Sequence, residues 1–211
     1  MSGQYNLTSN LTSDTLYVIA SGISGGKDEP FVEYLFDALK EYGSVISLQF
    51  ANDPIYNDDM LPDMNEISVE DYFACIDSAI AAASEKKAPT HIVFVAHSFS
   101  AIIATYYLGA HEKETASADY TLITIDNDDS DAALKYIDSL NEEARKDKFQ
   151  NPFSPSTTQY LREHPSAHLL NALSVRKHHI DADEVGADHE FESDESKRLL
   201  IDRILSVTTN A

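Results

Sequence analysis

The sequence predicts an α/β fold: a predominantly parallel sheet of about five to seven strands, flanked by helices on both faces in three layers. Short apolar runs with the length of a buried strand alternate with longer segments whose apolar residues recur at helical spacing. Turn-forming residues separate the two kinds of segment. Because neighbouring parallel strands need crossover connections, this alternation favours a parallel sheet covered by helices.

The first unit is a strand, a glycine loop and a helix. Leu16 to Ala20 is the apolar run, and three of the seven glycines of the chain follow at residues 22, 25 and 26. Pro30 suits the first turn of a helix, and Gly43 is typical of the position just after one. The residues between them carry an apolar stripe at helical spacing: Phe31, Tyr34, Leu35, Ala38 and Leu39.

Three similar units and an excursion follow. The expected strands lie at 45–50, 91–95, 120–125 and within 169–180, and the expected helices at about 69–84, 101–108, 131–146 and 193–207. Residues 151–166 contain three prolines, which predicts a proline-broken excursion with one short helix. The loops after parallel strands meet at one edge of the sheet, where binding sites form. The loops expected there are 22–26, 96–100, 126–129 and 181–189.

Length and composition indicate one globular domain. The chain has 211 residues, of which 43% are apolar and 24% charged, which suits a single core. Residues 1–14 are polar and show no period, so we expect a flexible leader ahead of a single domain at 15–211. No apolar run is long enough to cross a membrane, and the leader lacks the features of a secretory signal. We therefore expect a cytoplasmic protein.

The charge balance restricts the partners. Fifteen basic and 36 acidic side chains give a formal net charge of −21, which repels nucleic-acid phosphates and anionic lipid headgroups. Neither nucleic acid nor a membrane is expected as a partner. The single cysteine, Cys75, lies in an apolar helical segment, which predicts a buried thiol rather than thiol chemistry.

The sharpest local pattern surrounds Ser98. This serine stands between an apolar strand and a helix, with the small residues Ala96 and Ser100 two positions away on either side. A strand that turns directly into a helix strains the backbone at the apex, and small neighbours let the two arms approach. The apex hydroxyl would then be exposed, with the Phe99 N–H placed to bind a developing oxyanion. Simple capping of the helix is the alternative role for this serine.

In these residues the sequence resembles the α/β-hydrolase superfamily. The nucleophile elbow of that family reads small-x-nucleophile-x-small and often has histidine just before the nucleophile, as His97 stands before Ser98. The resemblance covers most of 15–207 and implies that Ser98 is the nucleophile of a serine hydrolase. Ala96 and Ser100 replace the two elbow glycines of the family.

Two further segments extend the resemblance. Ser21-Gly22-Ile23 stands where the family often has His-Gly-x, which implies that the Ile23 N–H is the second oxyanion donor. The segment 186–191 looks like the loop that presents the catalytic histidine of the family, which implies His189. Ser21 departs from the usual histidine.

The base must lie within hydrogen-bond reach of Ser98, because a serine hydroxyl is a weak nucleophile at neutral pH. His189 is the predicted base, since it lies in a loop after the last expected strand. His178 and His179 are weaker candidates because they lie at or inside that strand. His97 is expected to support the elbow.

The triad also needs a carboxylate that holds the tautomer of the base. Asp126 follows the fourth strand directly and Asp129 lies three positions further, so these two are the predicted acids. Asp181 and Asp183 are the alternatives if the excursion contains an additional strand. Capping of the next helix is the ordinary role of such residues.

Two other kinds of site are disfavoured. The glycines at 22–26 have neither the G-x-G-x-x-G spacing nor the Lys-Ser/Thr pair of a nucleotide-binding loop. The acidic tract 181–195 matches no EF-hand loop, so a solvated face is favoured over a metal site.

The residues and the resemblance together imply a serine hydrolase that cleaves a carboxylic ester, or a thioester, of a small or medium uncharged substrate. The scheme needs no cofactor. The acidic charge disfavours polyanionic substrates, and the excursion at 151–166 is too short for a large lipase lid. The alternative is a catalytically silent hydrolase fold that serves as a binding or interaction module through its acidic surface.

Overall fold

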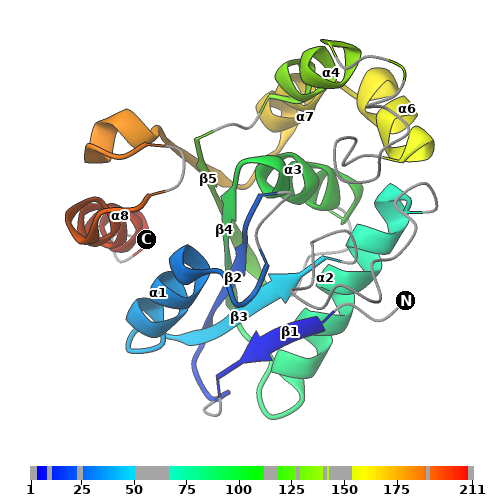
Figure 1. Ribbon diagram of the computed structural model, residues 1–211. Coiled ribbons are helices and arrows are strands. Elements are labelled where there is room, and N and C mark those ends of the chain that lie inside the picture. Colours follow the sequence, from blue (N-terminus) through cyan, green and yellow to red (C-terminus); the bar gives the residue numbers. More distant parts are fainter. Residues whose placement is uncertain are drawn as a thin grey trace, which may run out of the picture.

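The computed structural model of the chain describes residues 4–8, 11–22, 26–50, 67–111, 118–126, 129–139, 142, 154–188 and 191–208. Within them, the strands of one sheet are β1 (Gln4–Leu7), β2 (Thr15–Ala20), β3 (Ser44–Gln49), β4 (His91–His97), β5 (Asp119–Ile125) and β6 (Arg176–Ile180). The helices are α1 (Pro30–Leu39), α2 (Val69–Ser84), α3 (Phe99–His111), α4 (Ser130–Ser139), α6 (Pro155–Glu163), α7 (Ser166–Ala172) and α8 (Asp194–Thr208), with a short 3₁₀ helix, η2, at Ala182–Val185. Helices lie on both faces of the sheet (Figure 1), which confirms the predicted class.

The strands lie across the sheet in the order β1-β3-β2-β4-β5-β6. From β3 to β6 all neighbours pair in parallel, whereas β1 pairs with β3 antiparallel. β4 lies inside the sheet between β2 and β5, and every residue from Ile92 to His97 is buried. A strand buried on both faces is apolar throughout rather than alternating. This explains why the run at 92–95 is continuously apolar.

β1 lies where the sequence predicts a flexible leader. It extends the edge of the sheet beside β3, with Leu7 opposite Ile46. Tyr5 and Leu7, on one face of the strand, pack against the hydrophobic core. Four residues are too few to show a strand period, so the pattern of residues 1–14 gives no sign of this element.

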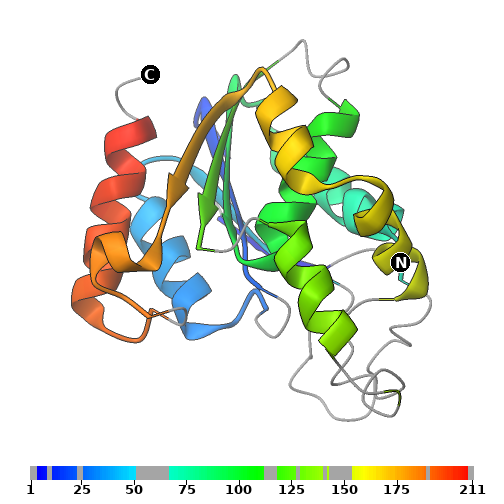
Figure 2. The ribbon, with the colours of Figure 1, turned by 90° about the horizontal axis from the view of Figure 1, so that it is seen from above.

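Hydrophobic clusters fill the spaces on both faces of the sheet. α2 and α3 cover one face, and α1 and α8 cover the other (Figure 2). Side chains of β4 alternate between the two clusters: Phe94 belongs to the first, and Val93 and Val95 belong to the second. Both helical layers are therefore needed to bury β4.

α3 is buried on all sides over most of its length, since every residue from Phe99 to Leu108 is buried. Its outer side is covered by the excursion that follows α4. The Tyr106 ring packs on Tyr160 of α6 with ring centroids 5.1 Å apart, and its hydroxyl donates to the His164 carbonyl at 2.6 Å. Among the described residues of 151–166 the structure has one helix, α6, as the sequence predicts, and α7 begins at the last residue of that range. Pro155 and Pro165 stand at the starts of these two helices, where proline is tolerated.

The sequence predicts a buried thiol at Cys75 and no segment that crosses a membrane. The Cys75 thiol is buried in α2 and lies 3.6 Å from the Gln49 carbonyl, to which it donates. The predicted buried thiol is confirmed. None of the helices in the described ranges is long and apolar enough to cross a membrane.

Two adjacent leucines test how α8 packs on the sheet. Leu200 is fully buried, whereas Leu199 is 37% exposed. We expect Leu200→Ala to lower the free energy of unfolding by about 2–5 kcal/mol, because it leaves a cavity in the core. Leu199→Ala should lower it by less than about 1 kcal/mol. Denaturant unfolding measures both values, and equal losses would contradict this packing.

Candidate active site

Ser98 is the single residue between β4 and α3. Its backbone is left-handed, with φ 56°, a conformation that costs an L side chain roughly 1–2 kcal/mol. Its N–H donates to the Ile125 carbonyl of β5 at 2.9 Å, and its own carbonyl accepts the Ala101 N–H at 2.9 Å. The side chain is partly exposed. The turn therefore has the strained backbone that the sequence predicts for an exposed apex hydroxyl.

The small residues beside the apex form the turn without glycine. Ala96 is buried and pairs with Ala20 of β2. The Ser100 hydroxyl is also buried, and it lies 2.6 Å from the Ala20 carbonyl and 2.9 Å from the His97 carbonyl. The Ser100 side chain thus fits between α3 and β2 because its hydroxyl donates a hydrogen bond to the Ala20 carbonyl at the end of β2. The two departures from the family pattern leave the shape of the elbow intact.

The loop after β2 packs directly on Ser98. A Cβ atom on Gly22 would lie 3.2 Å from the Ser98 Cβ and 3.5 Å from its Oγ, so even a methyl group there would press on the Ser98 side chain. Ser21 is buried, and its hydroxyl donates to the Glu29 carboxylate at the other end of the loop. The Ile23 amide, the predicted second oxyanion donor, lies outside the described residues. Phe99, the predicted first donor, is the first residue of α3.

The segment around the predicted base lies beside the elbow. His189 itself lies outside the described residues, but Phe191 does not. The Phe191 ring is fully buried, and its centroid lies 5.8 Å from that of His97, the residue before Ser98. The Phe191 N–H donates to the Asp188 carbonyl at 3.3 Å, so a backbone hydrogen bond links the residues before and after position 189. The structure therefore places Phe191, two residues after His189 in the chain, next to the elbow.

The two histidines of β6 have other partners. His178 and His179 point to opposite faces of the strand, as neighbours in a strand do. The His179 ring nitrogens lie 2.8 Å from the Thr124 hydroxyl and 2.9 Å from the Asp181 carboxylate. Burial lowers the pKa of His178, and two nearby arginines lower it further. Both ring nitrogens of His179 thus have partners other than Ser98.

The candidate acids differ in their partners. Asp126 follows β5 with a left-handed backbone, φ 65°, and its N–H donates to the Ile180 carbonyl at 2.9 Å. The Asp129 carboxylate accepts the Asp131 N–H at 2.9 Å, which is the capping contact that the sequence allows as an alternative. Asp181 binds His179, and Asp183 is exposed in η2.

The pairing of β4 with β5 positions one of these acids beside the elbow. His97 lies opposite Ile125 in the parallel register, so Ser98 and Asp126 follow neighbouring strands at the same edge of the sheet.

No group of three or more His, Cys, Asp or Glu side chains in the described ranges could hold a metal ion.

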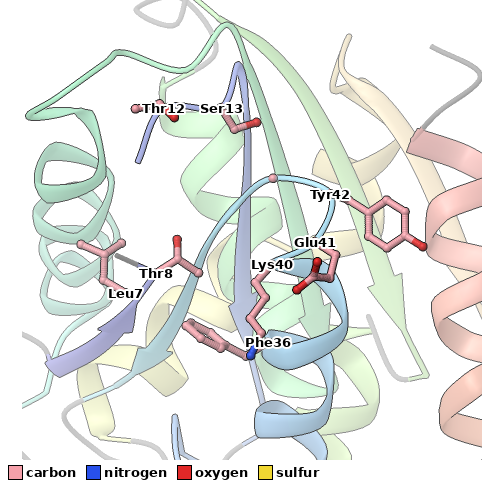
Figure 3. A pocket seen from close by; sticks show the side chains of 9 residues that line it. Leu7, Thr8, Thr12, Ser13, Phe36, Lys40, Glu41 and Tyr42 are labelled. Carbon is pink, nitrogen blue, oxygen red and sulfur yellow. The ribbon is translucent and has the colours of Figure 1, made fainter. Parts of the chain in front are cut away.

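Two cavities lie away from the elbow. One of about 630 Å³ lies at the amino ends of the parallel strands, between the end of β1, the segment before β2 and the end of α1 (Figure 3). Ser98 is at the carboxyl end of β4, at the opposite edge of the sheet. A smaller cavity of about 220 Å³ lies between β5, β6 and α7, beside Thr124 and His179.

The backbone is similar to those of solved hydrolases. Alpha/beta hydrolase domain-containing protein 10 from mouse has 11% sequence identity and a TM-score of 0.64, over 98% of this chain and 93% of that one. Est1E from Butyrivibrio proteoclasticus, solved with ferulic acid bound, has 12% identity and a TM-score of 0.63, over 99% of this chain and 94% of that one. The chain has the α/β-hydrolase fold.

This α/β-hydrolase fold also occurs with other chemistry. A variant of AqdC, solved with the Pseudomonas quinolone signal whose ring it cleaves, has 10% identity and a TM-score of 0.66, over 98% of this chain and 95% of that one. No family model and no curated protein matches the sequence itself. The reaction must therefore be argued from the site rather than from the fold.

The strain at Ser98 predicts an unusual effect of glycine. Glycine adopts a left-handed backbone without steric cost, whereas alanine does not. We expect Ser98→Gly to be more stable than Ser98→Ala by roughly 0.5–1 kcal/mol in denaturant unfolding. The same pair at Ser206, inside α8, should show the opposite order by about 1 kcal/mol. Equal stability of the two Ser98 variants would contradict a strained apex.

Proposed function

We propose that this protein is a serine hydrolase that cleaves a carboxylic ester, or a thioester, of a small or medium uncharged substrate. The observation that carries the proposal is the left-handed backbone of Ser98 at the junction of β4 and α3. Gly22 has no side chain that would obstruct access to the Ser98 hydroxyl, and the first turn of α3 follows Ser98 directly. A capping serine needs neither the strain nor the exposure.

The mechanism uses one nucleophile, one base and two backbone donors. Ser98 Oγ attacks the carbonyl carbon while His189 takes the hydroxyl proton. The N–H groups of Phe99 and Ile23 bind the oxyanion of the tetrahedral intermediate. Collapse of the intermediate breaks the bond to the alcohol or thiol, which takes the proton from His189. Water, activated by the same histidine, then releases the acid and restores Ser98.

We assign the role of the acid to Asp126, with Asp129 as the second choice. Asp126 follows the strand next to the elbow, and its carboxylate would hold the tautomer of His189 and stabilise the imidazolium. Asp129 already accepts a backbone N–H at the start of α4. Asp181 is already bound to His179.

The proposed substrate follows from charge and from the neighbours. At low ionic strength the net charge of −21 repels polyanionic substrates, because little salt is present to screen it. Ferulic acid is bound in the structure of Est1E. We therefore choose esters of aromatic acids, together with short-chain acyl esters, as the first substrates to assay. A cytoplasmic location agrees with the composition and belongs to the same proposal.

Labelling with a fluorophosphonate probe tests the nucleophile and the base together. We expect one adduct on the wild type by intact mass, none on Ser98→Ala, and labelling slower by at least about 10³-fold on His189→Ala. His168→Ala, an exposed histidine of α7, is the matched control and should label like the wild type. Labelling is measured at low and high salt, because screening reduces the self-repulsion of so acidic a chain. A folded wild type without an adduct would favour the binding-module alternative.

The acid is tested by three matched substitutions. We expect Asp126→Asn to lower kcat for a p-nitrophenyl ester by roughly 10²–10⁴-fold, because the base loses its orienting carboxylate. Asp129→Asn and Asp181→Asn should stay within about threefold of the wild type, and Asp129→Asn keeps a side chain that can cap α4. A larger loss in either of these variants than in Asp126→Asn would reassign the acid.

A further inference from the structure

Three aromatic rings meet beneath the proposed active site. The Phe31 and Phe191 rings stack with centroids 4.9 Å apart and an angle of 21° between their planes. The His97 ring meets both edge-on, at 5.3 Å from Phe31 and 5.8 Å from Phe191. Each ring thus contacts the other two, and all three residues are at most 5% exposed. Offset and edge-to-face contacts of this kind fix the relative orientation of the rings.

Each ring belongs to a different segment of the proposed site. His97 precedes the nucleophile Ser98. Phe31 is the second residue of α1, which follows directly on the loop from Ser21 to Glu29. Phe191 is two residues after His189. The cluster therefore connects the elbow, the helix that follows the loop after β2, and the residue two positions after His189.

The backbone of Phe191 indicates that this contact is maintained against strain. Its φ is 50°, which is an outlier for a bulky residue. Such conformations persist only where the surrounding structure determines them, and they cluster at functional sites. Elsewhere the cluster of buried residues on this face is largely aliphatic. An aliphatic contact would bury the segment equally well but would orient it less strictly.

From these contacts we propose that Phe31, His97 and Phe191 form one positioning unit that sets the geometry between the nucleophile, the base and the oxyanion loop. The inference rests on the proposed hydrolase function. The rings do not touch the substrate; they act through the residues that follow or precede them in the chain. Loss of one ring should therefore slow the chemical step and leave binding of the probe almost unchanged, because small displacements of reacting groups cost rate steeply.

The test compares ring-to-leucine substitutions inside and outside the unit. Phe31→Leu, Phe191→Leu and the double variant remove rings of the unit, and Phe94→Leu removes a buried ring from the other face of β4. We expect kinact for the fluorophosphonate to fall by at least about 10-fold in each variant of the unit, with KI within about twofold. The double variant should lose no more than the worse single variant, since the rings act as a unit. Phe94→Leu should keep the wild-type kinact.

Hydrogen exchange separates this proposal from the proposed function. In the folded Phe191→Leu protein we expect faster exchange of amides in both 26–30 and 186–193, with no such change in Phe94→Leu. This readout does not depend on reactivity at Ser98. If the wild type does not label but exchange changes as expected, the hydrolase function fails and the joining of the segments stands. If Phe191→Leu labels and exchanges like Phe94→Leu, the positioning unit is refuted.

Discussion

The parallel pairing of β4 with its two neighbours is the constraint on which the elbow depends. β5 accepts the Ser98 N–H through the Ile125 carbonyl, and β2 accepts the Ser100 hydroxyl through the Ala20 carbonyl. Both acceptors are backbone groups of strands that are themselves buried. The sheet therefore holds the left-handed residue, and no glycine is needed beside it. Removing either neighbour would release the turn.

The sequence predicts the order of the fold because each local signal agrees with its tertiary setting. Leu16–Ala20 and the run at 92–95 are apolar throughout, and both lie in strands that are buried on two faces. Pro30 starts α1 as expected, and the small residues around Ser98 predict a strand that turns directly into a helix. Such features depend on near neighbours in the chain, which a pattern of residues records.

Features that depend on distant contacts could not be predicted in this way. The conformation of Phe191 is set by rings about 90 and 160 residues away in the chain, at His97 and Phe31. Asp126, Asp129 and Asp181 all follow strands and precede helices, so their spacing does not separate them. Asp129 contacts the start of α4 and Asp181 contacts His179, and the spacing of these residues records neither contact.

The burial of α3 from Phe99 to Leu108 has a consequence for synthesis on the ribosome. Its outer side is covered by Tyr160 and its neighbours in α6 and α7, which leave the exit tunnel only after more than forty further residues have been added. At about 5–20 residues per second, an apolar helix waits for its cover for some seconds. During that interval the nascent chain exposes an apolar surface of the kind that chaperones exist to shield.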